Sequence, residues 1–382
     1  MTRFTLNTPT KLCFGEKCIE FLEPYLRSHR RVAIVCGRKS ARVSGALQDV
    51  EQLLGKLGIE YIVIDKVVPN PSCSLIDAVA EEVWRFGPHA LIAIGGGSAI
   101  DTAKLVATIV ACGGSCRDYL YGARKASRNL PLYAINLTHG TGSEVDRYAV
   151  ATIDETREKL GAGVCYPTAS VDDPRYTLTL PRNQTLYTSI DALFHAIEAA
   201  TSTLANPFTE MLSVEAARKI FEYLPKALEK PDDVDARYWL LYASMIAGIA
   251  IDVAATHIVH ILEHVLSGLR PELPHGAGLG IVGPKLLEHI YRAKPRICAE
   301  ILKPLDPSLS GSPEEASRAR KSLEKFLRDV GFDEKLSNYG FTEKDLENVL
   351  KLLETKPFRS WMRLTPFEVT KQIIEETYLE NL

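Results

Sequence analysis

The chain has 382 residues, of which 46% are hydrophobic and 24% are charged, and its formal net charge is -3 at pH 7. This length and composition are typical of a globular protein with room for two or three domains. The balanced charge and the lack of a basic run in the sequence argue against a nucleic-acid partner, because binding to phosphates in general requires an excess of positive charge.

The N-terminal sequence and the cysteines bear on where the protein works. The opening stretch, MTRFTLNTPTKLCFG, alternates polar and apolar residues and has no apolar core of signal-peptide length. No uninterrupted apolar run approaches the ~18 residues that cross a membrane. The eight cysteines form no CxxC pair, which favours reduced thiols over disulfides and disfavours a zinc site at Cys112 and Cys116. We therefore expect a cytoplasmic protein without a membrane partner.

The first part of the chain alternates short apolar runs with amphipathic patterns. Strands are predicted at 31–37, 60–65, 90–97 and 130–138, and helices at 44–58, 74–87 and 99–114. Strand following helix in this order predicts parallel βαβ units with helices on both faces of one sheet.

From Leu186 onward the patterns are helical, over 186–204, 207–228 and 236–269, and a loop followed by a capped helix is expected at 305–327. The predicted fold class is therefore α/β plus all-α. A Rossmann-like parallel-sheet domain is predicted over 1–180 and an all-helical domain over 181–382, and the motifs described below predict that the first binds a dinucleotide and the second binds metal and substrate.

Three glycines and a serine, Gly95 to Ser98, follow the buried strand LIAI where a helix is predicted to begin. Backbone amides at a helix N-terminus attract phosphate, and glycine lets a pyrophosphate approach that backbone. The strict dinucleotide fingerprint is absent, since Ile100 stands where its third glycine would be. A plain tight turn is the alternative. Lys104 is expected to pair with Asp101 or to face solvent.

A second polar loop, Asn136 to Asp146 (NLTHGTGSEVD), follows the next predicted strand. Its threonines, glycines and serine suit hydrogen bonding to the phosphates or ribose of a ligand. A surface turn with capping hydroxyls is the alternative, but two such loops at neighbouring strand ends favour a ligand cleft.

Four side chains in the helical half could hold a divalent metal. Asp191 and His195 are four residues apart on one predicted helix face, and His260 lies on another helix before a Pro-His-Gly turn that contains His275. The residues around Asp191 and His260 are apolar, and polar groups there are costly unless they are paired or bound to metal. Ordinary paired core residues are the alternative, and spacing alone leaves His257 as a competing ligand.

Read in order, these segments resemble the iron-containing (group III) alcohol dehydrogenases of the dehydroquinate synthase-like superfamily. The resemblance rests on PNPS (69–72), AIGGGSAIDTAK, THGTGSEV, VDDPRYTLTLP, DALFHAIEA, HILEHVLSG and PHGAGL, and it weakens after about Lys285. It implies a metal-dependent dehydrogenase that transfers hydride reversibly between an alcohol and a nicotinamide cofactor.

The resemblance also implies the roles of individual residues. The metal ligands would be Asp191, His195, His260 and His275, with Fe2+ expected and Zn2+ the alternative. His264 would lie close to substrate and nicotinamide and relay the hydroxyl proton, whereas His257 would be structural. The implied cofactor-binding residues are Asn70, Gly95, Gly96, Gly97, Ser98, Asp101, Thr138, Thr141, Ser143 and Lys159.

One departure from the family pattern concerns the choice of cofactor. Many members that use NAD have an acid after the first long strand, which holds the ribose hydroxyls, but here Gly37 stands in that place, followed by Arg38, Lys39 and Ser40. Those three side chains could accept a 2′-phosphate through charge and hydrogen bonds. NADP(H) is therefore expected, with NAD as the alternative. His139, where a small residue is usual, is a second departure.

The expected partner is a small alcohol or aldehyde, and the expected assembly is a homodimer. The alternative functions are a polyol or sugar-phosphate dehydrogenase, or a dehydroquinate synthase-like lyase, on the same scaffold. A non-catalytic binding protein is disfavoured because the Asp191, His195, His260 and His275 set is complete.

Overall fold

The structure is a computed structural model and describes residues 3–382. The chain divides into two compact units. The sheet unit comprises Asn7–Pro181 and Pro231–Leu241, and the helical unit comprises Arg182–Lys230 and Tyr242–Leu382 together with the N-terminal residues up to Leu6. The predicted spans 1–180 and 181–382 were each continuous, whereas the sheet unit also contains a segment from the second half of the chain.

The sheet unit is built on one parallel sheet of six strands in the order β1-β8-β5-β4-β2-β3. The strands are β1 (Lys11–Phe14), β2 (Arg31–Gly37), β3 (Glu60–Val67), β4 (Ala90–Gly95), β5 (Leu132–Asn136) and β8 (Ala169–Asp172). The central strands β2, β4 and β5 are buried almost throughout, which explains why they read as continuous apolar runs.

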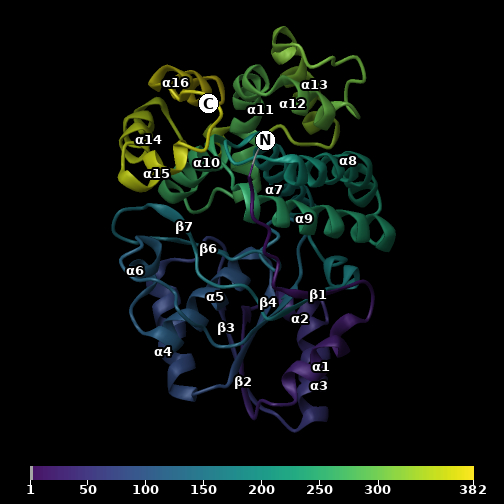
Figure 1. The fold of residues 1–382 in the computed structure, drawn as a ribbon, viewed down its shortest axis with the longest axis vertical. Coiled ribbons are helices and arrows are strands. Elements are labelled where there is room, and N and C mark those ends of the chain that lie inside the picture. The colour runs from purple at the N-terminus through teal and green to yellow at the C-terminus, as the bar shows by residue number, and fades with distance from the viewer. Residues whose placement is uncertain (1–2) are drawn as a thin grey trace. The chain divides into compact units, whose positions relative to one another are not determined.

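Helices cover both faces of this sheet, as the βαβ pattern predicts. They are α1 (Glu23–Leu26), α2 (Ser40–Val43), α3 (Ala46–Leu57), α4 (Cys73–Phe86), α5 (Gly97–Cys112) and α6 (Cys116–Leu120), with short 3-10 helices at Cys18–Leu22 and Pro174–Thr177. In Figure 1, α3 lies on one side of the sheet and α4 and α5 lie on the other. The parallel-sheet domain expected from the sequence is confirmed.

Four strands of this unit were not anticipated. β1 and β8 form one edge of the sheet, and β6 (Tyr148–Thr152) and β7 (Lys159–Gly163) form an antiparallel pair of their own. Each has only four or five residues, too few for an alternating pattern to stand out from a loop.

A buried arginine helps to attach the segment Pro231–Leu241 to the sheet unit. Arg237 is fully buried, and it donates hydrogen bonds to the carbonyl of Pro231 and, at 3.1 Å, to Nε2 of His139. Burial, with the nearby arginine, lowers the pKa of His139 to about 3, so this imidazole is neutral and can accept. The unusual histidine of the threonine loop therefore contacts a residue about a hundred positions later in the chain.

The rest of the chain is helical, as predicted. The helices are α7 (Arg182–Thr201), α8 (Pro207–Glu229), α9 (Val234–Ala254), α10 (Ile258–Leu269), α11 (His275–Ala293), α12 (Pro295–Leu302), α13 (Ala316–Asp329), α14 (Leu346–Leu353), α15 (Lys356–Met362) and α16 (Lys371–Glu380), with 3-10 helices at Pro313–Glu315, Leu336–Tyr339 and Glu343–Asp345.

The pattern over 236–269 read as one continuous helical stretch, but the structure breaks it into α9 and α10. The break lies at Ala255, whose φ of 58° is left-handed, so the chain turns before α10 begins at Ile258. Within residues 3–382, α9 alone is long and apolar enough to cross a membrane, and 61% of its apolar window is buried inside the protein. Such burial is typical of a core helix.

Candidate dinucleotide site and metal centre

The order of the strands places the polar loops of the sheet unit around one point. From β2 the chain goes outward to β3 and then returns to the other side of β2 to form β4. In open parallel sheets, ligands bind outside the carboxyl ends of the strands where the winding direction reverses. Here the two strands at that point end in Gly37 and Gly95, and the neighbouring β5 ends in Asn136.

The glycine turn and the threonine loop pack directly against each other. A Cβ on Gly96 would lie 2.7 Å from the Thr138 side chain, and one on Gly97 would lie 2.5 Å from the Thr141 side chain. A Cβ on Gly95 would lie 2.5 Å from Cβ of Ala99. A side chain at Gly96 or Gly97 would therefore collide with the threonine loop, and one at Gly95 would collide with Ala99 of α5. Helix α5 begins at Gly97 within this packed turn.

Lys104 contradicts both alternatives drawn from the sequence. It is fully buried rather than solvent-facing, and Nζ donates to Asp146 Oδ1 at 2.7 Å and to Ser143 Oγ at 2.8 Å. Asp101 instead accepts from Ser143 Oγ at 2.5 Å and from the backbone N–H of Val150 at 3.0 Å. Asp101 and Ser143, both predicted cofactor residues, thus belong to a buried network that holds the threonine loop on α5.

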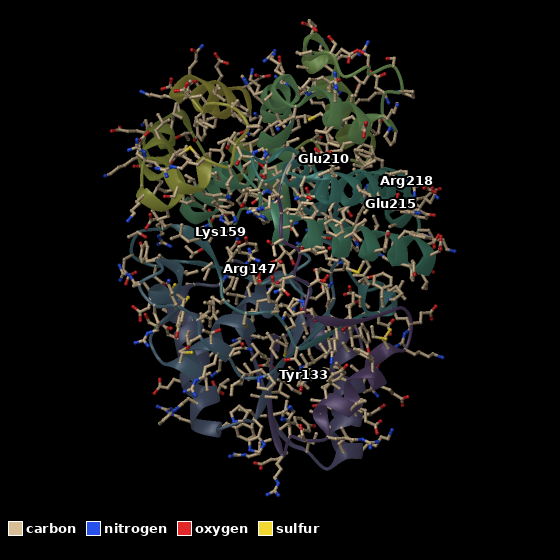
Figure 2. All side chains as sticks on the ribbon, in the orientation of Figure 1. Tyr133, Arg147, Lys159, Glu210, Glu215 and Arg218 are labelled. Atoms are coloured by element: carbon tan, nitrogen blue, oxygen red, sulfur yellow. The ribbon has the colours of Figure 1, made fainter. Side chains whose placement is uncertain are left out.

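The other predicted cofactor residues lie on neighbouring elements. Arg38, Lys39 and Ser40 are exposed directly after β2, and Asn70 lies in the turn between β3 and α4 with a left-handed φ of 49°. Lys159 is buried at the start of β7 (Figure 2). Among residues 3–382, no ion pair engages Arg38 or Lys39, whereas the nearby Asp65 pairs with Arg42 at 3.1 Å.

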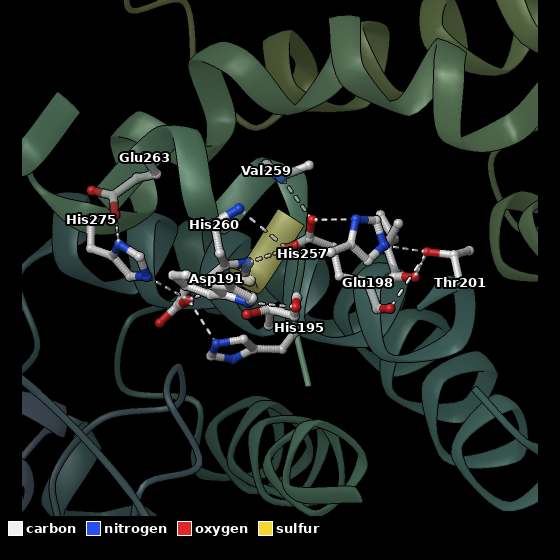
Figure 3. A network of polar contacts seen from close by, with 12 residues as sticks. Asp191, His195, Glu198, Thr201, His257, Val259, His260, Glu263 and His275 are labelled. Atoms are coloured by element: carbon white, nitrogen blue, oxygen red, sulfur yellow. Dashed lines mark hydrogen bonds and ion pairs between the residues drawn. The ribbon is translucent and has the colours of Figure 1, made fainter. Parts of the chain in front are cut away.

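In the helical unit, three imidazoles surround one carboxylate oxygen. Asp191 Oδ1 lies 3.4 Å from Nε2 of His195, 3.5 Å from Nε2 of His260 and 3.4 Å from Nε2 of His275 (Figure 3). All four side chains named in the sequence analysis as metal ligands therefore meet at one place. The carboxylate and His195 come from one face of α7, His260 from the first turn of α10, and His275 from the first residue of α11.

A glycine allows His275 to reach this cluster. The next residue is Gly276, where a Cβ would lie 1.9 Å from the carbonyl oxygen of Tyr187 on α7. Only a residue without a side chain lets the start of α11 pack so closely against α7. The Pro-His-Gly sequence is thereby explained, because its glycine is needed for packing and its histidine for the cluster.

Two glutamates orient the histidines, and sequence reasoning missed both. Glu198 Oε2 lies 2.5 Å from Nδ1 of His260, and Glu263 contacts Nδ1 of His275 (Figure 3). With Nδ1 held by a carboxylate, each imidazole presents Nε2 to the centre. Each glutamate lies three residues after a predicted histidine ligand on its own helix. The repeated His-x-x-Glu spacing was therefore the sequence pattern that could have identified both glutamates.

Glu198 also fixes the start of α10. Its Oε1 accepts the backbone N–H of Val259 at 2.7 Å, and its Oε2 accepts that of His260 at 3.3 Å. His257, the competing ligand, is fully buried; its Nε2 lies 2.9 Å from Thr201 Oγ1 and its Nδ1 lies 3.0 Å from Glu198 Oε1. Its ring nitrogens thus contact the support of the cluster and not Asp191.

His264 lies beside the cluster, and one of its ring nitrogens is within 4.8 Å of ligand atoms of Glu263 and His275. Its ring centroid is 5.5 Å from that of His275 and 5.0 Å from that of Trp361, in edge-to-face arrangements. The indole N–H of Trp361 donates to the carbonyl of Thr256 at 2.7 Å, which fixes the indole beside the imidazole. The imidazole of His264 is therefore a direct neighbour of His275.

The charges of the cluster favour a cation. Burial opposes ionisation of Asp191, yet the neighbouring His195 and His275 hold the pKa of this carboxyl well below its usual value. Burial likewise opposes ionisation of Glu198, but His257 and His260 lower its pKa to about 2. Two buried carboxylates are therefore ionised at neutral pH, where they attract positive charge.

The residues also fit a metal ion by geometry. Ligands ~2.1 Å from one tetrahedral cation lie about 3.4 Å apart, and the three distances from Asp191 Oδ1 have this size. They are too long for good hydrogen bonds, and among the described residues neither Asp191 Oδ1 nor His260 Nε2 has a hydrogen-bond partner although both are buried. A buried orphan acceptor next to an orphan imidazole nitrogen is the pattern that a metal ion satisfies.

One unit has a parallel sheet with polar loops at the carboxyl ends of its strands, and the other has a buried cluster of one carboxylate and three imidazoles, which are the features expected of a metal-dependent dehydrogenase. Comparison with protein families agrees. Residues 9–174 match the iron-containing alcohol dehydrogenase family, and residues 185–382 match the C-terminal domain of Fe-containing alcohol dehydrogenases. The chain belongs to the iron-containing alcohol dehydrogenase family and is an enzyme of that class.

Individual relatives support this assignment over the full length. The chain is 41% identical to the long-chain primary alcohol dehydrogenase of Thermoanaerobacter ethanolicus, covering 99% of this chain and 97% of that protein. It is 31% identical to the NAD-dependent methanol dehydrogenase of Bacillus methanolicus, over 81% of this chain and 82% of that protein.

Solved structures share the fold across the whole chain. An archaeal alcohol dehydrogenase from a Red Sea brine pool superimposes with a TM-score of 0.92 at 26% identity and covers 100% of both chains. The iron-containing alcohol dehydrogenase of Thermotoga maritima gives a TM-score of 0.84 at 30% identity, covering 100% of this chain and 99% of its own.

Proposed function

We propose that this alcohol dehydrogenase transfers hydride reversibly between a primary alcohol and NADP(H), with a ferrous ion held by Asp191, His195, His260 and His275. The observation behind the proposal is the single oxygen of Asp191 within 3.5 Å of three Nε2 atoms. Zn2+ is the alternative metal, because one carboxylate and three imidazoles suit several divalent ions.

The residues of the helical unit would each perform one task in this reaction. When bound, the metal supplies a Lewis acid that lowers the pKa of the alcohol hydroxyl. The carboxylates of Glu198 and Glu263 keep Nδ1 of their histidines protonated, so that Nε2 stays available as a ligand. His264 accepts the hydroxyl proton at a ring nitrogen and returns it when the aldehyde is reduced, since imidazole has a near-neutral pKa.

The cofactor would be bound at the carboxyl ends of β2, β4 and β5. The amides at the start of α5, with Gly95, Gly96, Gly97 and Ser98, suit the diphosphate. The remaining residues proposed for cofactor binding are Asn70, Asp101, Thr138, Thr141, Ser143 and Lys159. For Asp101 and Ser143 the internal hydrogen bonds indicate that they act by shaping the threonine loop.

The exposed residues after β2 support NADP(H) over NAD(H). Arg38 and Lys39 are two positive side chains without an ion pair among residues 3–382, at the position where the adenosine ribose of a bound dinucleotide is expected. Gly37 supplies no carboxylate to repel a 2′-phosphate. The relative from Bacillus methanolicus is named NAD-dependent, so cofactor choice is the property in which we expect this chain to differ.

The first substrates to test are primary alcohols with extended alkyl chains, because the relative with 41% identity is named for them. The apolar indole of Trp361 beside His264 is compatible with an alkyl chain at this side of the cluster. We also propose that the protein is a homodimer and that it works in the cytoplasm.

The experiment strips the purified protein of metal, reloads it with Fe2+ or Zn2+, and measures metal content and turnover with NADPH and NADH. We expect Fe2+ and NADPH to give the higher activity toward long-chain aldehydes. His260→Ala should abolish both metal binding and turnover. The matched control is His289→Ala, which removes a half-buried histidine of α11 outside the cluster. If His260→Ala keeps bound metal and full activity, the metal assignment is wrong.

A further inference from the structure

Two buried cysteines of the sheet unit face each other across two helix starts. Cys73 is the first residue of α4 and Cys116 is the first residue of α6. Their Sγ atoms are 3.0 Å apart, and the residues are only 5% and 0% exposed. Non-bonded sulfur atoms normally stay wider apart than this, whereas a disulfide bond brings them to about 2.05 Å.

The backbone around both sulfurs is held by independent hydrogen bonds. Asp77, one turn after Cys73 on α4, accepts the backbone N–H of Cys116 at 2.7 Å. Ser72 caps the start of α4, and Ser115 forms a capping box with Asp118 at the start of α6. These contacts hold the backbone of both cysteines in place, so the two Cβ atoms stay opposite each other.

We propose that Cys73 and Cys116 are a disulfide-forming pair whose oxidant is a small organic disulfide such as oxidised glutathione. The sulfur of Cys73 attacks the small disulfide, its S–S bond breaks, and one small thiol leaves. The sulfur of Cys116 then displaces the second small thiol and forms the protein disulfide. Two protein thiols lose two electrons and two protons, and the small disulfide is reduced to two thiols.

The local structure allows the opening that this exchange requires. α6 is only five residues long and follows Gly113 and Gly114, which have left-handed φ values of 73° and 88°. Opening of this short segment would expose the sulfurs without unfolding the sheet. The cross-link closes a loop between positions 43 residues apart, so we expect it to raise the Tm by about 5 °C or more.

The pair is independent of the metal cluster and of the proposed function. Cys73 lies three residues after Asn70, so the cross-link would join the turn between β3 and α4 to the start of α6. All eight cysteines, including Cys73 and Cys116, are free thiols in the structure. Among them, the buried Cys298 of α12 serves as a control, because it lies in the helical unit.

The experiment equilibrates the full chain in glutathione buffers of increasing oxidised fraction, both as the folded protein and during refolding from urea. Free thiols are then alkylated in denaturant and counted by intact mass. We expect six alkylated cysteines out of eight under oxidising conditions, a single cross-linked peptide containing Cys73 and Cys116, and the increase in Tm. Cys298→Ala should form the same cross-link.

The variant Cys73→Ala lacks the attacking sulfur and should keep its seven remaining thiols free, whereas Cys116→Ala should stop at the mixed disulfide between Cys73 and glutathione. Neither variant should form the protein cross-link or show the increase in Tm on oxidation. Because the refolded samples expose every sulfur to the oxidant, limited access to the buried pair cannot hide a negative result. Eight free thiols at every glutathione ratio, or a cross-link that maps to Cys13 and Cys18 or to any other pair, would overturn the proposal.

Discussion

Replacing Glu198 by glutamine should weaken metal binding although Glu198 is not itself a ligand. The carboxylate has two acceptor oxygens, one 2.7 Å from the Val259 N–H and the other 2.5 Å from Nδ1 of His260. A glutamine has one acceptor oxygen and one donor amide in the same place. If the oxygen stays on the Val259 N–H, the amide N–H faces Nδ1–H of His260, donor against donor.

His260 can relieve this clash only by moving its proton to Nε2, which removes the lone pair that binds metal. The cost of that tautomer change or of the lost contact is of order 1.4–2.8 kcal/mol, the value of one charge-assisted hydrogen bond. This free-energy cost corresponds to about 10- to 100-fold weaker metal affinity. Removing a carboxylate that holds a metal-binding histidine has an effect of this size in other metalloproteins. Glu198→Ala should lose more, because the start of α10 also loses its acceptors.

The assay titrates metal-free protein with Fe2+, and separately with Co2+, against a chelator of known affinity. A matched control is Glu215→Gln on α8, where Glu215 pairs with Arg218 at 2.8 Å at the surface (Figure 2). Surface pairs contribute ~0–1 kcal/mol, so this control should bind metal like the wild type. Unchanged metal affinity in Glu198→Gln, with native circular dichroism, would refute the orienting role.

Three further predictions concern other parts of the molecule. Gly37→Asp should shift the ratio of kcat/KM from NADPH toward NADH by about 10-fold or more, because the carboxylate repels a 2′-phosphate; a Cβ there is tolerated, 3.4 Å from the Val67 carbonyl, and an unchanged ratio contradicts the proposed ribose site. His264→Gln should lower kcat about 100-fold while iron content stays at the wild-type level, and loss of iron in this variant would show that His264 acts as a ligand instead. Burial raises the pKa of Asp172 from 3.8 to about 7, so its contribution to stability is full below pH 3.8 and is lost as pH rises through 7. In urea unfolding, wild type should therefore lose stability between pH 4 and 8 relative to Asp172→Asn, and parallel pH curves would contradict the raised pKa.

The fold could be predicted well where the sequence carries a strong local pattern. The apolar runs of β2, β4 and β5 are continuous because both faces of a parallel sheet are buried. The short strands β1 and β8 have four residues each, and they pair with each other although they lie about 160 positions apart in the chain. The break between α9 and α10 was equally hidden, because Ala255 is a good helix former whose left-handed φ is imposed by its surroundings.

The site could be predicted as a set of residue types but not as a network. An aspartate and three histidines in apolar surroundings indicated a cluster, and the structure brings all four side chains together. Lys104 was misread because its partner Asp146 comes from another loop and not from the same helix. Glu198 and Glu263 were missed for the same reason. Each lies three residues after one histidine of the cluster in sequence but contacts a different histidine in space.

This crossed arrangement couples the metal cluster to the folding of α10. Glu198 on α7 accepts from the first amides of α10 and from the ring of His260, while Glu263, later on α10, contacts the ring of His275 at the start of α11. The start of α10 is therefore fixed by the same carboxylate that orients His260. Because His260 lies in the first turn of α10, the position of its ring cannot change without disturbing the acceptor of the helix amides. Buried carboxylates are costly to maintain, and here the charge of Glu198 stabilises both a helix end and a ligand orientation, which explains why an acid rather than an amide occupies this position.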